Sequence, residues 1–246
     1  MEELLWFILI GFCANLIDGC IGMAYGTIVA SILTVMGIPA LQISAGIHFS
    51  EIFTTLASAL SHLKIKNIDF KLLKKIVFAG VIGGILGAIC LSFVSQTFIQ
   101  PIITVYLILI GCSLMQKACN NFKHKKKIKL ITPIGFLGGF CDALCGGGWG
   151  PIVNGSLIGQ SKEVAKTIGT VNTAEFFVTL TQSIVFFLVI GFKSLSIVTG
   201  LIIGGVLAAP LAVYIIQKIN PRILCFLIGV IILITNLIMF IKFIRG

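Results

Sequence analysis

Charge is scarce in this sequence. Of the 246 residues, 11% are charged, and only eight are Asp or Glu. In soluble domains about a quarter of the residues are charged, so the composition excludes an ordinary soluble domain. Hydrophobic residues make up 58% of the chain. Apolar runs of about 20 residues favour membrane-spanning helices over barrel strands. The sequence therefore predicts an all-α polytopic membrane protein with one membrane domain and short loops.

The motifs of common enzyme and cofactor sites are also missing. There is no HExxH, GxSxG or Cys–His spacing, so an intramembrane enzyme is the weaker alternative and we predict no catalytic residues. The eight Cys form no CxxC pairs, and we predict neither a metal nor another cofactor. The stretch CGGGWGPI at 145–152 lacks the GK[ST] of a P-loop and follows no predicted strand. Soluble phosphate-binding motifs are thereby excluded.

Positive charge is concentrated in two loops. The net charge is +10, and the dense Lys clusters lie at 62–75 and 117–129, each beside an apolar run. This pattern indicates cytoplasmic loops in the cell (inner or plasma) membrane rather than nucleic-acid binding. Both termini then lie outside. Lys193, Lys242 and Arg245 would also lie outside, so the orientation rests on the two dense clusters.

The chain matches itself at an offset of 124 residues. GFCANLIDGCIGMAYG at 11–26 aligns with GFLGGFCDALCGGGWG at 135–150, and the same offset pairs Glu51 with Glu175. After a shortened loop, VIGGILGA at 81–88 aligns with IIGGVLAA at 202–209. We therefore expect a duplicated unit. The first repeat is 1–116, the basic cytoplasmic linker is 117–129, and the second repeat is 130–246.

Each repeat contains about five helical segments. These are a glycine-interrupted apolar pair, a helix with one Glu and two further spans: 4–37, 40–62, 72–94 and 100–116 in the first half, and 128–160, 164–190, 195–216 and 222–243 in the second. An odd number of segments inserts the second half upside down. The fold class is therefore two inverted-topology repeats with glycine-broken hairpin helices, as in many secondary transporters.

The three consecutive glycines before Trp149 predict a break in a helix. Each Gly costs about 1 kcal/mol relative to Ala, and Pro151 removes a donor and disfavours helix at the residue before it. Pro151 suits the first turn of a new helix to about residue 159, whose N-terminus at membrane depth could bind an anion. Close helix packing is the alternative, and we prefer it for the glycines of 80–87.

A polar stripe follows one face of each Glu-bearing helix. The stripe is Ser44, His48, Glu51, Thr55 and Ser58 in the first half, and Asn172, Glu175, Thr179 and Gln182 in the second. A carboxyl group in a span is costly. Glu51 and Glu175 therefore either carry a coupling proton or hold a broken helix end as a latch.

The other polar groups have open roles as well. His48 is a proton carrier, an anion contact or a structural residue. Asp18 and Asp142 precede the breaks, and a cap or latch is favoured over substrate contact. No Lys or Arg lies deep in a predicted span. An anionic substrate must therefore be met by helix N-termini, backbone N–H groups, hydroxyls and His48.

Four ordered stretches resemble one known family. They are DGCIGMAYG, LSHLKIKNIDFKLLKKIVFAGVIGGILGA, GGFCDALCGGGWGPIV and TIGTVNTAEFFVTL. Together they resemble the sulfite exporter TauE/SafE family of membrane transporters, over nearly the whole chain. The resemblance implies a secondary transporter that exports a small sulfur-containing anion, such as sulfite or an organosulfonate, driven by the proton gradient. It implies no enzymatic activity.

The resemblance and the repeat together mark a substrate site. The residues are Gly22, Tyr25 and His48 in the first half, and Gly146, Gly147, Gly148, Trp149, Thr170 and Asn172 in the second. The first half has MAYG where the second half has GGWG, so the site should be asymmetric. The alternatives are a proton-coupled carrier of another solute or cation, and a passive anion channel. The expected partners are a small anion, protons and the lipid bilayer; a homo-oligomer is left open.

Overall fold

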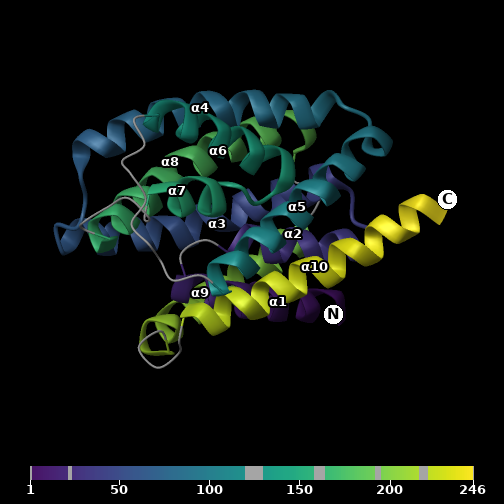
Figure 1. Ribbon diagram of the computed structural model, residues 1–246. Helices are drawn as coiled ribbons and strands as arrows, with labels where there is room; N and C mark the ends of the chain where they lie inside the picture. The colour runs from purple at the N-terminus through teal and green to yellow at the C-terminus, as the bar shows by residue number, and fades with distance from the viewer. Residues whose placement is uncertain are drawn as a thin grey trace.

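The computed structural model describes residues 2–21, 24–119, 130–157, 164–191, 195–215 and 221–245, and within these ranges it is helical and contains no strand (Figure 1). Among the described residues, four helices are long and apolar enough to cross a membrane: Phe70–Phe93, Gln96–Gln116, Lys166–Ile190 and Cys225–Lys242. Shorter apolar helices accompany them. The all-α membrane class predicted from the composition is confirmed.

The helices follow the order expected from the sequence. The first half holds α1 (Glu2–Ile21), α2 (Tyr25–Val35), α3 (Ala40–Lys64), α4 (Phe70–Phe93) and α5 (Gln96–Cys119). The second half holds α6 (Ile131–Cys145), η1 (Gly150–Asn154), α7 (Gly155–Leu157), α8 (Val164–Ile190), α9 (Leu195–Ile215) and α10 (Pro221–Arg245). Most of the linker 117–129 lies outside the described residues.

The helix after the second break is less regular than expected. Gly150–Asn154 forms a π-helical turn with Pro151 near its start, and the short α7 continues it to Leu157. Pro151 lies in the first turn, where its missing N–H leaves no intrahelical hydrogen bond unmade. Beyond Leu157 the predicted end of this helix lies outside the described residues.

Helices of the two halves pack against each other. The most extensive contacts join α1 to α9, α6 to α4, α5 to α10 and α3 to α8. In Figure 1, α4 and α6 lie together on one side of the molecule, and α1, α9 and α10 lie on the other. Buried residues of one core cluster come from both halves, including Leu33, Ile47, Phe186 and Ile232. The two halves therefore share a core.

The α1–α9 and α6–α4 interfaces use equivalent close contacts. A Cβ added to Gly11 would lie 2.8 Å from the Leu201 carbonyl oxygen, and one added to Gly135 would lie 3.2 Å from that of Ile76. Similarly, Asn15 Nδ2 donates to the Gly205 carbonyl at 2.6 Å, and Gly139 lies against the Gly80 carbonyl. The close approaches at Gly11, Gly135 and Gly139 leave no room for a larger side chain.

These contacts differ by one helical turn from one part of the internal alignment. The match of 81–88 with 202–209 pairs Gly84 with Gly205, whereas the contacts make Gly80 the equivalent of Gly205. The difference is four residues, about one helical turn. Glycines recur at 80, 83, 84 and 87 along the same helix. A sequence match there can slip by one turn with little loss of identity.

Candidate functional site

Each break is closed by an aspartate carboxylate. In the first half, Asp18 Oδ1 accepts hydrogen bonds from the backbone N–H groups of Ala24 at 2.6 Å and Tyr25 at 3.0 Å. In the second half, Asp142 Oδ1 accepts hydrogen bonds from the N–H groups of Gly148 and Trp149. Their lengths are 2.8 and 3.0 Å. The offset of 124 residues relates each donor and acceptor residue of the first break to its counterpart in the second. The carboxylates thus satisfy N–H groups that a helix start leaves without partners.

The second break depends on glycine at its turn. Helix α6 ends at Cys145, and Gly146 follows with φ 67° and ψ 21°, in the left-handed region. A residue with a Cβ is strained there, and glycine is not. The predicted break between Cys145 and Gly150 is confirmed. In the first half, α1 ends at Ile21 and α2 begins at Tyr25.

The two breaks cross in direct backbone contact. A Cβ added to Gly26 would meet the Gly146 carbonyl oxygen and lie 2.8 Å from Gly147 Cα. A Cβ added to Gly147 would meet the Thr27 nitrogen and the Gly26 carbonyl carbon. No side chain fits between them. Glycine at these positions therefore lets segments 121 residues apart touch, 147 minus 26.

A small cavity lies where the breaks cross. Its lining comes from both breaks and both Glu-bearing helices: Asp18, Ala24, Tyr25, Gly26, Thr27, Glu51, Asp142, Gly147, Gly148, Gly150, Pro151 and Glu175. The cavity volume is about 10 Å³, close to the minimum of roughly 10–15 Å³ that one water molecule needs. The site is therefore closed to a small oxyanion in this conformation.

The cavity is lined by acidic side chains. Asp18, Glu51, Asp142 and Glu175 all contribute, and among the described lining residues none is Lys, Arg or His. Carboxylates that share a buried space repel one another, since little water screens them. An anion entering such a space would be repelled too. The cavity can therefore hold protons or a cation readily, and an anion only when carboxyl groups are protonated.

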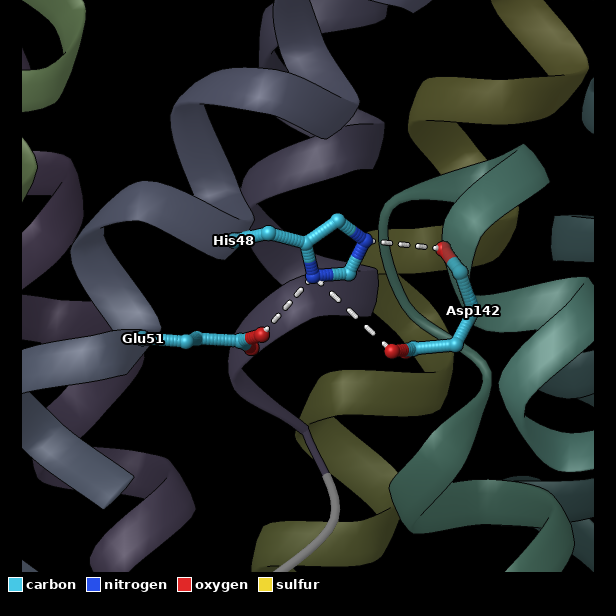
Figure 2. Close-up of side chains that lie close together, drawn as sticks. All are labelled: His48, Glu51 and Asp142. Atoms are coloured by element: carbon cyan, nitrogen blue, oxygen red, sulfur yellow. Dashed lines mark hydrogen bonds and ion pairs between the residues drawn. The ribbon is translucent and has the colours of Figure 1, made fainter. Parts of the chain in front are cut away.

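His48 connects the Glu-bearing helix of the first half to the break of the second. Figure 2 shows its ring between Glu51 and Asp142. Nδ1 lies 3.3 Å from Glu51 Oε2 and 3.8 Å from Asp142 Oδ2, and Nε2 lies 3.3 Å from the Asp142 carbonyl oxygen. The ring also stacks on Phe186 of α8, with centroids 5.8 Å apart and planes 3° from parallel. Contacts with three elements hold the imidazole in place.

Gln182 completes the surroundings of Asp142. Its Nε2 donates to Asp142 Oδ2 at 3.2 Å and to the Gly139 carbonyl at 3.1 Å. The sequence placed Gln182 on the polar face of α8 but suggested no contact for it. Because the contact joins α8 to α6, no local pattern could have revealed it. Asp142 is therefore held from α3, from α8 and from its own break.

A metal fits this group poorly, although the spacing is short enough. One atom each of His48, Glu51 and Asp142 lies within 4.8 Å of the others. However, Asp142 Oδ1 already accepts two N–H groups and Oδ2 accepts a third. A cation would have to compete with these hydrogen bonds for the carboxylate. We assign no metal or cofactor to the site.

Several residues singled out in the sequence meet at this cavity. Tyr25, Gly147 and Gly148 line it, as do all four acidic residues. The Tyr25 hydroxyl also contacts Ser50 Oγ at 2.9 Å. Gly146 forms the turn at the end of α6 and faces Ile47. Asp18 is equivalent to Asp142 in the repeat, and Glu51 to Glu175. The structure thus brings equivalent residues of the two halves to the same cavity.

Other singled-out residues lie away from the cavity lining. Trp149 is fully buried, and its Nε1 donates to the Val171 carbonyl at 3.2 Å. Thr170 Oγ1 donates to the Lys166 carbonyl and accepts from the Asp69 N–H. Asn172 accepts from Asn154 at 3.4 Å and contacts Ser58 at 3.5 Å. Their substrate contacts stay predictions. Gly22 lies outside the described residues.

Five lining residues were not among the predicted site residues: Ala24, Gly26, Thr27, Gly150 and Pro151, although the sequence placed Gly150 and Pro151 at the second break. The repeat contains the signal that finds them. It pairs Ala24 with Gly148, Gly26 with Gly150 and Thr27 with Pro151. Taking both members of every pair in the breaks would have predicted these positions.

Comparison with known proteins identifies similar sequences. The family model described as Sulfite exporter TauE/SafE matches residues 7–239. A Bacillus subtilis (strain 168) protein with the description "Probable membrane transporter protein YtnM" is 35% identical over 246 aligned positions. The alignment covers 96% of this chain and 82% of the relative. No solved structure matches the chain.

Proposed function

Because the chain belongs to the sulfite exporter TauE/SafE family and is a multi-pass membrane transporter rather than an enzyme, we propose that it exports a small sulfur-containing anion with proton coupling. Sulfite or an organosulfonate is the proposed substrate class. The two halves, 1–116 and 130–246, are proposed to act as inverted repeats that expose one central site alternately to either side.

One observation carries this proposal: the closed cavity where the two breaks cross. Equivalent residues of both halves line it, among them Asp18 with Asp142 and Glu51 with Glu175. A site shared by two related halves can open to one side when they move in one direction, and to the other side when they move back. The contact between Gly26 and Gly147 lies at the centre of that movement.

The acidic lining supports the coupling to protons. An anion in this cavity needs neutralised carboxyl groups nearby, since no basic side chain is among the described lining residues. Proton binding and anion binding at this site are therefore coupled.

The proposed orientation follows from the basic loops. Loops 62–75 and 117–129 lie on the cytoplasmic side, and both termini lie outside. Lys64 and Lys66, at the end of α3 and just after it, are exposed, as the proposal requires. Labelling a cysteine placed at Lys66 in whole cells with a membrane-impermeant reagent tests this. Labelling without permeabilisation contradicts the orientation.

The transport assay uses purified protein in proteoliposomes. Sulfite, an organosulfonate and thiosulfate are each supplied with and without a pH gradient. Saturable flux that changes with the gradient supports the proposal. Flux that is not saturable indicates a passive channel, and no flux of any of these anions argues against an anion transporter.

The same acidic lining favours one competing function, a proton-coupled carrier of a cation. Four carboxyl groups, with no basic side chain among the described lining residues, would attract a cation directly. Adding an unlabelled monovalent or divalent cation to the assay separates the two functions. If the cation competes with protons and no anion flux is seen, the cation carrier is supported.

A further inference from the structure

The two nitrogens of His48 have different partners, and one partner fixes the position of a hydrogen. Nε2 lies 3.3 Å from the backbone carbonyl oxygen of Asp142 (Figure 2). A carbonyl oxygen only accepts hydrogen bonds, so Nε2 carries the hydrogen and donates it. The remaining nitrogen, Nδ1, faces two carboxyl oxygens, Glu51 Oε2 at 3.3 Å and Asp142 Oδ2 at 3.8 Å.

This arrangement requires one more proton. Without it, the Nδ1 lone pair would face two negative oxygens. His48 is 0% exposed, Asp142 is 3% exposed and Glu51 is 6% exposed, so little water is present to separate the charges. A single proton removes the conflict, either on Nδ1 or on a carboxyl group that donates to Nδ1.

The hydrogen bonds around Asp142 indicate which groups share this proton. Asp142 Oδ1 accepts from two backbone N–H groups, and Oδ2 accepts from Gln182. Both of its oxygens therefore have donors already. Glu51 Oε2 faces His48 Nδ1 directly and is the nearer carboxyl oxygen. The shared proton accordingly lies between Glu51 and His48.

Other titratable groups surround this pair. Asp18, Tyr25 and Glu175 line the cavity from α1, α2 and α8. Tyr106 of α5 donates to the Gly147 carbonyl at 3.4 Å, and the Cys141 and Cys145 thiols lie on α6 beside Asp142. These groups add negative charge around the pair when they ionise. Their charges would hold the shared proton more firmly.

The described part of the second half contains no equivalent proton site. The repeat places Asn172 where the first half has His48, and an amide does not titrate in this way. Asn172 contacts Asn154 and Ser58 instead of a carboxyl group of the opposite break. The cluster of an imidazole and two carboxyl groups is thus asymmetric, and it ties α3 to the second break.

We propose that His48 and Glu51 share one exchangeable proton next to the carboxylate of Asp142. This proton holds α3 of the first half to the break of the second half. Loss of the proton leaves a lone pair and two carboxylates facing one another, and the contact loosens. The proposal deepens the proposed function by naming the groups that hold the coupling proton. Proton binding itself can be tested without a transport substrate.

The test compares two histidine variants in the full chain. His48→Asn introduces the residue of the second half, and His62→Asn makes the same change on α3 outside the cluster, where His62 contacts Asn67. The melting temperature of each purified protein is measured from about pH 5 to about pH 8 in buffer with a metal chelator. The proton is bound in the folded state, so its stabilising effect is present at low pH and lost as the pH rises.

We expect the wild-type protein and His62→Asn to lose about 2–4 °C in one titration step as the pH rises, and His48→Asn to lack the step. A step that persists in His48→Asn, or a wild-type protein without a step, overturns the proposal. Should His48→Asn fail to fold, Glu51→Gln serves as the second variant. Its amide donates to Nδ1 without a proton, so it should be as stable at about pH 8 as the wild type is at about pH 5.

Two further outcomes distinguish the shared proton from a bound metal ion and from transport itself. Stabilisation of the wild type by Zn²⁺ at high pH, absent in His48→Asn, would show a metal ion at this point and overturn the proton assignment. The transport assay is read separately. Anion flux in proteoliposomes without a proton step in the wild type would keep the proposed function and reject the shared proton.

Discussion

Gly26 and Gly147, one from each break, lie so close that an added Cβ on either would meet the backbone of the other break. The contact lies beside a cavity lined by Asp18, Asp142, Glu51 and Glu175. Each break is capped by its own aspartate, with the same pair of hydrogen bonds in both halves. The cavity is thus lined by equivalent residues of both halves and lies beside one glycine crossing.

Gly147→Ala should disrupt the crossing. The new Cβ would meet the Thr27 nitrogen and the Gly26 carbonyl carbon, which are backbone atoms and cannot rotate away. Overpacking of this kind costs about 1–3 kcal/mol, and the melting temperature should fall accordingly. Gly46→Ala is the control, because its Cβ would meet only the Ile197 Cγ2 methyl, at 2.9 Å. Equal losses in the two variants would contradict the importance of the crossing.

Asp18→Asn should destabilise the protein less than Asp18→Ala. Asn keeps an oxygen that can accept from the N–H groups of Ala24 and Tyr25, whereas Ala leaves both without a partner. Replacing a capping residue by Ala costs about 0.5–2 kcal/mol, and Asn ranks with Asp as a cap. Thermal unfolding in detergent measures the difference. If Asp18→Asn is as unstable as Asp18→Ala, the negative charge matters rather than the cap.

Gln182→Leu should destabilise the site. It removes the donor to Asp142 Oδ2 and to the Gly139 carbonyl. A hydrogen bond to a charged group contributes about 1.5–3 kcal/mol. Ser183→Ala is a matched control on the next residue, since the buried Ser183 hydroxyl has no hydrogen-bond partner among the described residues. It should be neutral or slightly stabilising. A larger loss for Ser183→Ala than for Gln182→Leu would reject this role of Gln182 beside Asp142.

The two glutamates should differ in transport. Glu51→Gln removes the carboxyl group that faces His48 Nδ1, so the pH dependence of flux should disappear. Glu175 lines the same cavity, but the repeat gives it Asn172 in place of a histidine, so Glu175→Gln should retain a pH-dependent flux. Flux is measured in proteoliposomes at several pH values. A normal pH profile in Glu51→Gln would exclude Glu51 as the proton carrier and leave it a latch.

Much of the fold could be predicted because its signals are local. Long apolar runs indicate spans by length alone, and three glycines before Trp-Gly-Pro cannot continue a helix. Each capping aspartate accepts hydrogen bonds from N–H groups only six and seven residues further along the chain. The repeat further indicated that Asp18 matches Asp142 and that Glu51 matches Glu175.

The contacts between the halves could not be predicted. A repeat shows which residues are equivalent, and it does not show which residues touch across the two copies. The approach of His48 to Asp142, for example, joins residues 94 positions apart in different halves. The one-turn difference between the packing of α4 and that of α9 could not be predicted either. Their glycines recur along one helix face, and only packing against α6 and α1 selects the register.

The most direct test of the central claim is side-specific labelling of Thr27→Cys in a protein whose eight native Cys have been replaced. Thr27 lines the cavity at the crossing. Activity of the cysteine-free parent in proteoliposomes is checked first. Alternating access predicts that impermeant thiol reagents reach Cys at this position from either side of the membrane, and that the transported anion slows both reactions. Labelling from one side only, unchanged by the anion, would contradict alternating access at the crossing.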